Sequence, residues 1–273
     1  MEEITSAQNP RIRRIAQLQS KSRLRKEEGC FITEGVRIFQ DTPAAFLRAV
    51  YVTKERMEEL RETVLRKSQE AGAPVYIIPQ SLMNRISDTQ TPQGVLCEVQ
   101  MPAWHREDLL QAEKPLILML ENIQDPGNLG TMVRTAEAAG AAGLILSPDC
   151  TDLFGAKSVR ATMSAIFRVP VLTGADLQEE IPALQKAGVH IYAACLNDQA
   201  QLYDNINYPE NGGCAFLIGN EGSGLKEETI RAADQSVYLP MEGQIESLNA
   251  AVAASILLYE AARQKRHGVI IRG

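Results

Sequence analysis

The feature that most constrains the fold is a series of short, largely apolar segments that alternate with helical patterns in the second half of the chain. The first is LILML at residues 116–120, and it is followed by GLILS at 143–147, HIYAACL at 190–196 and CAFLIG at 214–219. Strands that are apolar on both faces are typical of a parallel sheet with helices packed on each side. We therefore predict an α/β domain over residues 116–273.

Helices and further strands occupy the stretches between these segments. The last helix contains the run AAVAASILL, so we expect it to be buried under another element or a partner subunit. The predicted helices are 129–140, 156–165, 176–187, one from Lys226 and 248–264, and the additional strands are 168–171 and 236–240.

The first hundred residues show shorter helices and strands in alternation. The expected elements are a basic helix over 10–25, helices at 36–41 and up to about Ala71, and strands at 31–35, 49–53, 75–79 and 94–99. The stretch that follows holds two prolines and the only tryptophan, which is typical of a connection. We predict a small α/β domain at 1–100, a linker at 101–115 and the larger domain at 116–273.

Composition excludes several classes of protein. No apolar run approaches the ~20 residues of a membrane-spanning helix, and the N-terminal stretch MEEITSAQNPRIRR lacks the apolar segment of a signal peptide, so we expect a cytoplasmic protein. The five cysteines are widely spaced without a CxxC pair, and the three histidines are isolated. Neither a disulfide framework nor a metal site is indicated.

Positive charge is concentrated near the N-terminus. The whole chain has a net charge of −6, but without seven basic residues in this region the balance is 21 basic against 34 acidic, or 21 − 34 = −13. Such asymmetry is typical of a phosphate-binding surface, and a solvated helix face is the alternative. The seven residues are Arg11, Arg13, Arg14, Lys21, Arg23, Arg25 and Lys26.

A glycine-punctuated stretch, ENIQDPGNLGTMVRTAEAAG, follows the first strand of the larger domain at residues 121–140. It has neither the paired glycines of the dinucleotide fingerprint GxGxxG nor the Gly-Lys-Ser/Thr of a phosphate loop. From this stretch alone, a tight turn at DPGN with Arg134 as a surface cation is an equally good interpretation.

Two further motifs follow other predicted strands. LIGNEGSGL at 217–225 has three glycines in six positions, which lets backbone groups face a ligand. LPMEGQIESLNAAVAAS at 239–255 places Ser247 and Asn249 at the start of an otherwise apolar helix. A helix cap explains one of these two polar residues but not both.

Taken in order, the three motifs resemble the SpoU (TrmH-like) branch of the SPOUT RNA methyltransferases. The resemblance covers residues from about 116 to 260, and the order and spacing of three separate motifs make it specific. The stretches ITSAQNPRIRRI and FITEGVRIF are similar to the small RNA-binding domain of ribosomal protein L30e type that often precedes this catalytic domain.

The resemblance implies a homodimer that transfers a methyl group from S-adenosylmethionine to a ribose 2′-hydroxyl of structured RNA, with no metal. A leading L30e-like domain favours 23S-type ribosomal RNA over transfer RNA. The resemblance also implies a C-terminal trefoil knot over residues 190–255, which is an exception to the rule that chains avoid threading. The residues that would hold the cofactor are Leu196, Ile218, Gly219, Leu239, Met241 and Leu248.

The catalytic residues implied by the resemblance lie in all three motifs: Asn128, Arg134, Glu221, Ser247 and Asn249. Because a guanidinium is hard to deprotonate in a protein, our hypothesis is that Arg134 binds the phosphate beside the target ribose, at the partner subunit's cofactor site, and stabilises the developing alkoxide. We expect Asn128 to orient Arg134, and Glu221 to hold that arginine or an amide of the third motif. A water-exposed loop carboxylate and a helix cap are the alternative interpretations of Glu221 and Ser247.

The segment KSVRATMSAIFRVPV at 157–171 departs from the family pattern VRASMGA, because Thr162 and Ser164 stand where Ser and Gly are common. This departure bears on local packing or substrate fit. Lys157 and Arg160 are candidate phosphate contacts, with solvated helix charges as the alternative. Two other functions compete with methyl transfer: a catalytically silent RNA-binding protein of the same fold, and a nicotinamide-dependent oxidoreductase, which the absence of GxGxxG disfavours.

Overall fold

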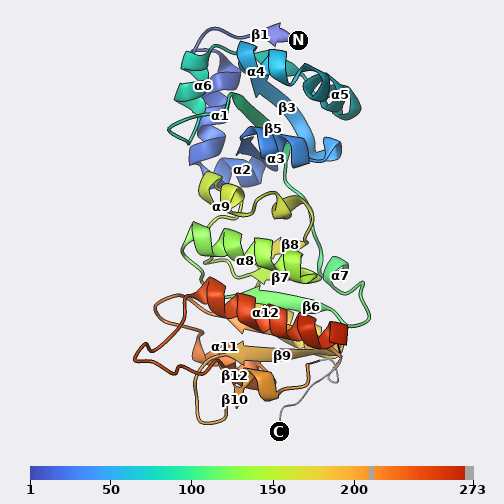
Figure 1. The fold of residues 1–273 in the computed structure, drawn as a ribbon, viewed down its shortest axis with the longest axis vertical. Helices are drawn as coiled ribbons and strands as arrows, with labels where there is room; N and C mark the ends of the chain where they lie inside the picture. Colours follow the sequence, from blue (N-terminus) through green and yellow to red (C-terminus); the bar gives the residue numbers. More distant parts are fainter. Residues whose placement is uncertain (209–211, 268–273) are drawn as a thin grey trace. The chain divides into compact units, whose positions relative to one another are not determined.

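The computed structural model describes residues 1–208 and 212–267, and it divides the chain into two compact units. The first unit contains residues 1–103 and 152–167, and the second contains residues 104–151 and 168–273. Each unit has a β-sheet of its own (Figure 1). In the described part of the chain no helix combines the length and apolarity that crossing a bilayer requires.

The first unit is built on a five-stranded mixed sheet in the order β1-β4-β3-β5-β2. Strands β1, β4 and β3 run parallel, and β5 is antiparallel to both β3 and β2. The strands are β1 (Glu2–Glu3), β2 (Cys30–Glu34), β3 (Leu47–Val52), β4 (Val75–Ile77) and β5 (Val95–Gln100). Its helices are α1 (Pro10–Ser20), α2 (Ser22–Glu28), α3 (Val36–Asp41), α4 (Lys54–Glu59), α5 (Arg61–Ala71), α6 (Gln80–Ile86) and α9 (Ala156–Ala161).

The basic helix predicted over 10–25 is two helices in the structure. Asn9 caps α1 by accepting a hydrogen bond from the Arg11 N–H, and Pro10 occupies the first helical turn, where its missing N–H costs nothing. The first helix ends because Lys21 takes an extended conformation, and α2 ends at Gly29 in the left-handed region. Apolar residues of α1 are buried against the sheet: Ile12, Ile15 and Leu18.

Residues 152–167 group with the first unit because they complete its core. Phe31 of β2 lies 5.1 Å from the ring centroid of Phe154 and 6.2 Å from that of Phe167. The helix predicted at 156–165 is shorter than expected, since α9 ends at Ala161. After it, Met163 and Ser164 both take positive φ angles, 49° and 71°, which no helix continues through.

A buried ion pair links α2 to this segment. Arg25 is only 5% exposed, and its guanidinium donates to the Asp152 carboxylate and to the carbonyls of Leu18 and Gln19. Burial alone would raise the pKa of Asp152, but hydrogen bonds from Arg25 and Ser22 outweigh it and hold that pKa below its usual range. The pair therefore stabilises the first unit above the ordinary pKa of an aspartate, and this contribution is lost as the pH falls through the lower, folded-state value.

The second unit has an all-parallel sheet of seven strands, as the apolar segments predict, in the order β10-β12-β9-β11-β6-β7-β8. The strands are β6 (Leu116–Leu120), β7 (Gly143–Leu146), β8 (Val171–Thr173), β9 (Val189–Ala194), β10 (Gln201–Leu202), β11 (Gly213–Ile218) and β12 (Gln235–Tyr238). Its helices are α7 (Arg106–Leu109), α8 (Pro126–Ala139), α10 (Leu177–Lys186), α11 (Glu227–Ala232) and α12 (Ala250–His267).

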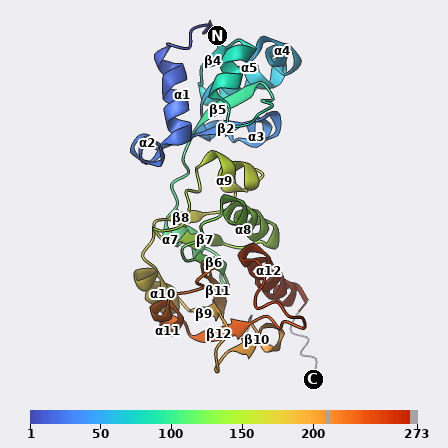
Figure 2. The same cartoon turned by 90° about the vertical axis from the view of Figure 1, so that its left-hand side faces the viewer.

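Helices cover both faces of this sheet. Helices α8 and α12 pack on one face, and α10 and α11 pack on the other (Figure 2). The central strands β11 and β6 are buried at every residue. Several predicted boundaries differ from those in the structure. For example, β8 begins where the strand predicted at 168–171 was to end, α8 begins at Pro126 rather than about 129, and α7 lies inside the predicted linker.

Replacing Asp152 with alanine should lower the free energy of unfolding by about 3 kcal/mol, because it leaves the buried Arg25 charge without its carboxylate. The measurement is the midpoint of urea unfolding followed by circular dichroism. The matched control is Glu27→Gln, which removes an exposed ion pair with Arg23 and should cost less than about 1 kcal/mol. Equal midpoints for the two variants would show that the Arg25–Asp152 pair adds nothing.

Candidate active site

Three segments of the second unit meet at the carboxyl ends of its central strands. They are the turn after β6 at residues 121–125, the loop after β11 at 219–226 and the stretch 239–249 that leads into α12. Side-chain hydrogen bonds connect all three. In open parallel sheets, ligands bind at this edge, where loops of adjacent strands converge.

A chain of three side chains runs through this site. The Asn249 Nδ2 donates to the Asn128 Oδ1 at 2.9 Å, and the Asn128 Nδ2 donates to the Glu221 Oε1 at 3.0 Å. The orientation of both amides is fixed, because the carboxylate only accepts, and at the other end the Asn249 Oδ1 accepts from the Ala251 N–H at 2.9 Å. The second amide hydrogen of each asparagine has no acceptor among the described residues, so it is available to a substrate.

Glu221 holds the start of α8 as well as Asn128. Its carboxylate accepts from the backbone N–H groups of Gln124 and Asp125, each at 3.2 Å. Burial alone would raise the pKa of Glu221, but the hydrogen bond from Asn128 and those from the backbone outweigh it and hold the pKa below its usual range. Glu221 is therefore a carboxylate at neutral pH, and it contacts an amide of the first motif rather than one of the third.

Helix caps account for part of the first and third motifs. Asp125 caps α8 by accepting from the Asn128 N–H at 2.7 Å, and Pro126 occupies the first turn. Asn249 accepts from backbone N–H groups at the start of α12, so the residue in the capping position is Asn249 and not Ser247. Ser247 is exposed and makes no hydrogen bond within residues 1–208 and 212–267.

Arg134 lies on the exposed side of α8, two turns beyond the helix start. It was expected to be oriented by Asn128 or held by Glu221, but both of those side chains have other partners. No hydrogen bond or ion pair joins Arg134 to any residue that the structure describes. Its guanidinium is therefore available to a phosphate or a partner subunit.

The loop after β11 is shaped by one close backbone crossing. A Cβ atom at Gly219 would lie 2.2 Å from the Gly224 carbonyl carbon and 2.3 Å from the Leu225 nitrogen, so only glycine fits there. Asn220 and Gly224 exchange two backbone hydrogen bonds, each of 3.0 Å, that close the loop. The Asn220 side chain also donates to the Asn122 carbonyl at 2.8 Å, which ties this loop to the turn after β6.

The residues expected to hold a cofactor lie at this same edge. Ile218 is the buried last residue of β11, and the others follow β9, β11 and β12, which are adjacent in the sheet. Leu196 after β9 is 80% exposed, and Leu239, Met241 and Leu248 are half-buried. Apolar side chains that are half-buried or exposed, on the same sheet edge as the bare backbone of Gly219, suit a flat aromatic group such as adenine, which needs apolar walls and backbone hydrogen bonds.

Sequence reasoning missed Glu121, Asn122 and Asn220, which hold the loops in place. Glu121 is 3% exposed, and Asn122 takes a positive φ of 56°. The sequence signal for Glu121 is its position directly after five apolar strand residues. A carboxylate there is expected to be buried, and a buried charge requires hydrogen-bond partners.

The predicted phosphate-binding residues differ in availability. Arg25 is buried in its pair with Asp152, so we no longer count it among them. Arg14 is paired with Glu28 and Glu98, and Arg160 with Asp88. Three exposed arginines are each in contact with another side chain: Arg11 with the Tyr76 ring, Arg13 with Gln8 and Arg23 with Glu27. By contrast, three exposed lysine side chains have no ionic or hydrogen-bond partner in the described part of the chain: Lys21, Lys26 and Lys157.

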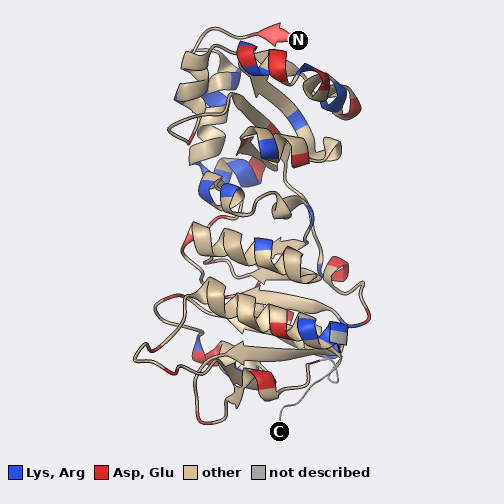
Figure 3. Ribbon diagram, viewed as in Figure 1, with Lys and Arg blue, Asp and Glu red and all other residues tan. Residues whose placement is uncertain are grey.

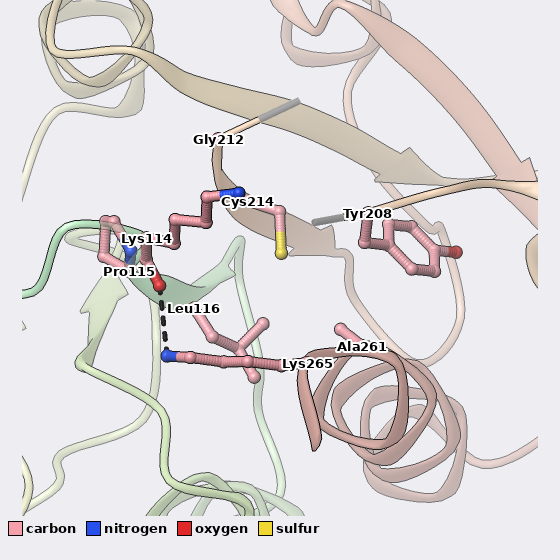
Figure 4. Close-up of a pocket in the computed structure, with 8 residues that line it drawn as sticks. All are labelled: Lys114, Pro115, Leu116, Tyr208, Gly212, Cys214, Ala261 and Lys265. Carbon is pink, nitrogen blue, oxygen red and sulfur yellow. Dashed lines mark hydrogen bonds between the residues drawn. The ribbon is translucent and has the colours of Figure 1, made fainter. Parts of the chain in front are cut away.

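A small cavity of about 30 Å³ lies at the opposite edge of the sheet, beside the first residues of β6 and β11 (Figure 4). Its apolar lining includes Leu116, Tyr208 and Cys214, and the Lys265 Nζ closes one side by donating to the Lys114 carbonyl at 3.3 Å. The volume is that of roughly one water molecule, which is too small for a cofactor. In residues 1–208 and 212–267, no group of three His, Cys, Asp or Glu side chains could hold a metal ion.

Comparison with known proteins identifies relatives of both parts of the chain. The model of the SpoU rRNA Methylase family matches residues 115–259, and that of the MRM3-like substrate binding domain matches residues 9–97. The 23S rRNA (guanosine(2553)-2′-O)-methyltransferase RlmP of Bacillus subtilis is 33% identical over 95% of this chain and 98% of its own. The 23S rRNA (guanosine-2′-O-)-methyltransferase RlmB of Neisseria meningitidis is 31% identical over 79% and 87%.

Solved structures give the same result. The AdoMet-bound rRNA methyltransferase from Sinorhizobium meliloti has a TM-score of 0.87 at 31% identity, covering 96% of this chain and 97% of that one. The SpoU methyltransferase AviRb from Streptomyces viridochromogenes, in complex with AdoMet, has a TM-score of 0.82 at 26% identity, covering 96% and 100%.

Replacing Gly219 with alanine should disrupt the loop after β11, because the new Cβ would overlap the backbone of Gly224 and Leu225. We expect a loss of at least about 3 kcal/mol in the free energy of unfolding, or fast amide exchange throughout 219–226 if the loop detaches instead. The matched control is Gly222→Ala in the same loop, whose Cβ would meet only the Asn220 Oδ1 at 3.5 Å. Wild-type stability and amide protection in Gly219→Ala would contradict the crossing.

Proposed function

Because the chain belongs to the SpoU rRNA methylase family, we propose that it methylates the ribose 2′-hydroxyl of a guanosine in 23S ribosomal RNA. The protein is an RNA 2′-O-ribose methyltransferase that uses S-adenosylmethionine. The choice of guanosine rests on the relatives named above. The observation that carries the proposed site is the chain of hydrogen bonds from Asn249 through Asn128 to Glu221.

The site has to align an alcohol and ease the loss of its proton. The cofactor supplies a methyl group already activated by its positive sulfur, so the protein mainly contributes orientation and electrostatics. The free amide hydrogens of Asn128 and Asn249 are placed to hold oxygens of the target nucleotide. Ionised Glu221 keeps Asn128 in one orientation, and the exposed Ser247 adds a hydroxyl from the segment that leads into α12.

Arg134 supplies the positive charge in this proposal. Its planar guanidinium can bind two oxygens of the phosphate beside the target ribose and can stabilise the alkoxide that develops as the proton leaves. It does not act as the base, since arginine keeps its proton in proteins. Its exposure and its lack of a partner among the described residues support this role.

A second copy of the chain completes the site in our proposal. Val252 and Tyr259 on α12 are each 46% exposed and lie two turns apart, with the half-buried Ile256 between them. This apolar stripe on a helix is typical of a subunit interface. Because α12 packs against α8, a partner on this stripe would lie near Arg134, which would then reach the partner's cofactor site.

The first unit binds the RNA in this proposal. It carries 17 basic and 14 acidic residues, or 17 − 14 = +3, whereas the second carries 11 and 20, or 11 − 20 = −9. Lysine and arginine residues gather on α2 (Figure 3). We assign phosphate contacts first to Lys21, Lys26 and Lys157, whose charges are unpaired among the described residues, and then to the exposed Arg11, Arg13 and Arg23.

The proposal keeps three further expectations. The threading of residues 190–255 into a trefoil knot follows from the family fold, and a domain border between 100 and 116 follows from the match of the substrate-binding model to residues 9–97. A ribosomal substrate implies a cytoplasmic location.

The test of the function uses tritiated S-adenosylmethionine with ribosomal RNA and transfer RNA from cells that lack this gene. Labelled RNA is digested, and the labelled nucleoside is identified by mass spectrometry. A 2′-O-methylguanosine from 23S RNA alone is the expected product. Label on a base, or in transfer RNA only, would overturn the proposal, and the absence of cofactor binding by calorimetry would favour the silent RNA-binding alternative.

Arg134→Ala should lower kcat by about 100-fold or more, because a charge aimed at the developing alkoxide is lost. Arg134→Lys should recover only part of the rate, since lysine lacks the bidentate fork. Arg168→Ala is the matched control, because Arg168 is an exposed arginine of the same unit that pairs with Glu137.

Mixing subunits tests whether Arg134 acts across the dimer. Arg134→Ala and Asn249→Ala subunits are each inactive as homodimers, but a mixed dimer has one complete site if the arginine comes from the partner. Random mixing should restore about a quarter of wild-type activity. No recovery from verified mixed dimers would place Arg134 in its own subunit's site.

A further inference from the structure

Glu121 is a buried carboxylate at the end of β6, and it stands outside the set of residues assigned to catalysis. Its Oε2 accepts from the Lys226 N–H at 2.7 Å, and its Oε1 accepts from the Thr229 hydroxyl at 2.6 Å. Thr229 is fully buried. Lys226 ends the loop after β11, and Thr229 lies in the first turn of α11. Glu121 therefore anchors the end of this loop to the end of β6.

Glu221 makes the reverse connection. It lies on the loop after β11 and accepts from two N–H groups of the turn after β6, at Gln124 and Asp125. Each of the two loops thus contributes a carboxylate that binds the other loop. Glu121 fixes one end of the segment 219–226, and Glu221 fixes its tip against the start of α8.

We infer that Glu121 is a positioning residue for the methyl transfer: by holding Lys226 and Thr229 it sets the place of Glu221, and through Glu221 the place of Asn128 and Asn249. This inference rests on the proposed function. It follows from geometry, because the loop between Gly219 and Lys226 has little freedom of its own. The Asn220–Gly224 closure and the tight crossing at Gly219 make it move as one piece.

The consequence is a coupling between two carboxylates of different motifs. If the end of the loop shifts, the Glu221 carboxylate shifts with it, and the hydrogen bond to Asn128 at 3.0 Å lengthens. Misplacing a catalytic group by about 1 Å can cost about 100-fold in rate. RNA binding should be unaffected, since the exposed basic residues of the first unit are not part of this network.

The experiment is a double-mutant cycle on kcat, with single-turnover measurements to isolate the methyl-transfer step from product release. Glu121→Gln keeps the shape but turns an amide N–H₂ toward a donor, and we expect it to lower kcat by about tenfold and to weaken cofactor binding, with the dissociation constant for RNA unchanged. In a Glu221→Gln background the same change should lower kcat by less than about twofold, because residues that act through one another are not additive.

Two further variants separate positioning from general instability. Thr229→Val removes one donor and keeps the volume, and it should reproduce the effect of Glu121→Gln. Lys226→Ala keeps the backbone N–H and removes an exposed ammonium group that lies 3.5 Å from Asp149 and 3.9 Å from Glu121; because exposed ion pairs contribute little, it should retain wild-type kcat. All variants are assayed well below their melting temperatures.

The outcomes are distinct. Equal effects of Glu121→Gln with and without Glu221→Gln would mean that Glu121 acts independently and would overturn the inference. A wild-type protein that binds cofactor but transfers no methyl group to RNA would instead overturn the proposed function. Calorimetric affinity for S-adenosylmethionine is measured for each variant as a readout independent of turnover.

Discussion

The crossing of the backbone at Gly219 is the constraint on which the rest of the site depends. Because no Cβ fits there, the chain after β11 can turn back on itself within six residues and present Glu221 at the tip of a closed loop. From that position the carboxylate reaches the start of α8 and fixes Asn128. The proposed catalytic residues, the proposed cofactor site and the role inferred for Glu121 all require this one loop to keep its shape.

The sequence was sufficient for the features that depend on local pattern. Apolar runs such as 116–120 and 214–219 predicted the parallel sheet, because a strand buried on both faces cannot show alternation. The motif residues Asn128, Glu221 and Asn249 were predicted from resemblance, and the structure brings them into contact. Their partners were not predictable, because hydrogen bonds between loops about 90 to 120 residues apart depend on tertiary geometry.

Tertiary structure also overrode the appearance of the basic segment. Seven cations between residues 11 and 26 look equivalent in sequence, yet Arg25 is buried while Lys21 and Lys26 are exposed. The departure at Ser164 has a local explanation. Its φ of 71° lies in the left-handed region, which favours glycine and costs other residues about 1 kcal/mol, so serine is accommodated there at a cost.

The composition of the first unit has a consequence for the order in which the protein matures. Its core includes Phe154 and Phe167, and its buried Arg25 pairs with Asp152. All three partners belong to a segment that the ribosome makes about fifty residues after Ala103. At a synthesis rate of roughly 5–20 residues per second, the N-terminal domain waits several seconds with part of its apolar surface uncovered. Folding of the two units is therefore interleaved rather than sequential, because the first unit is complete only after about a third of the second unit has been made.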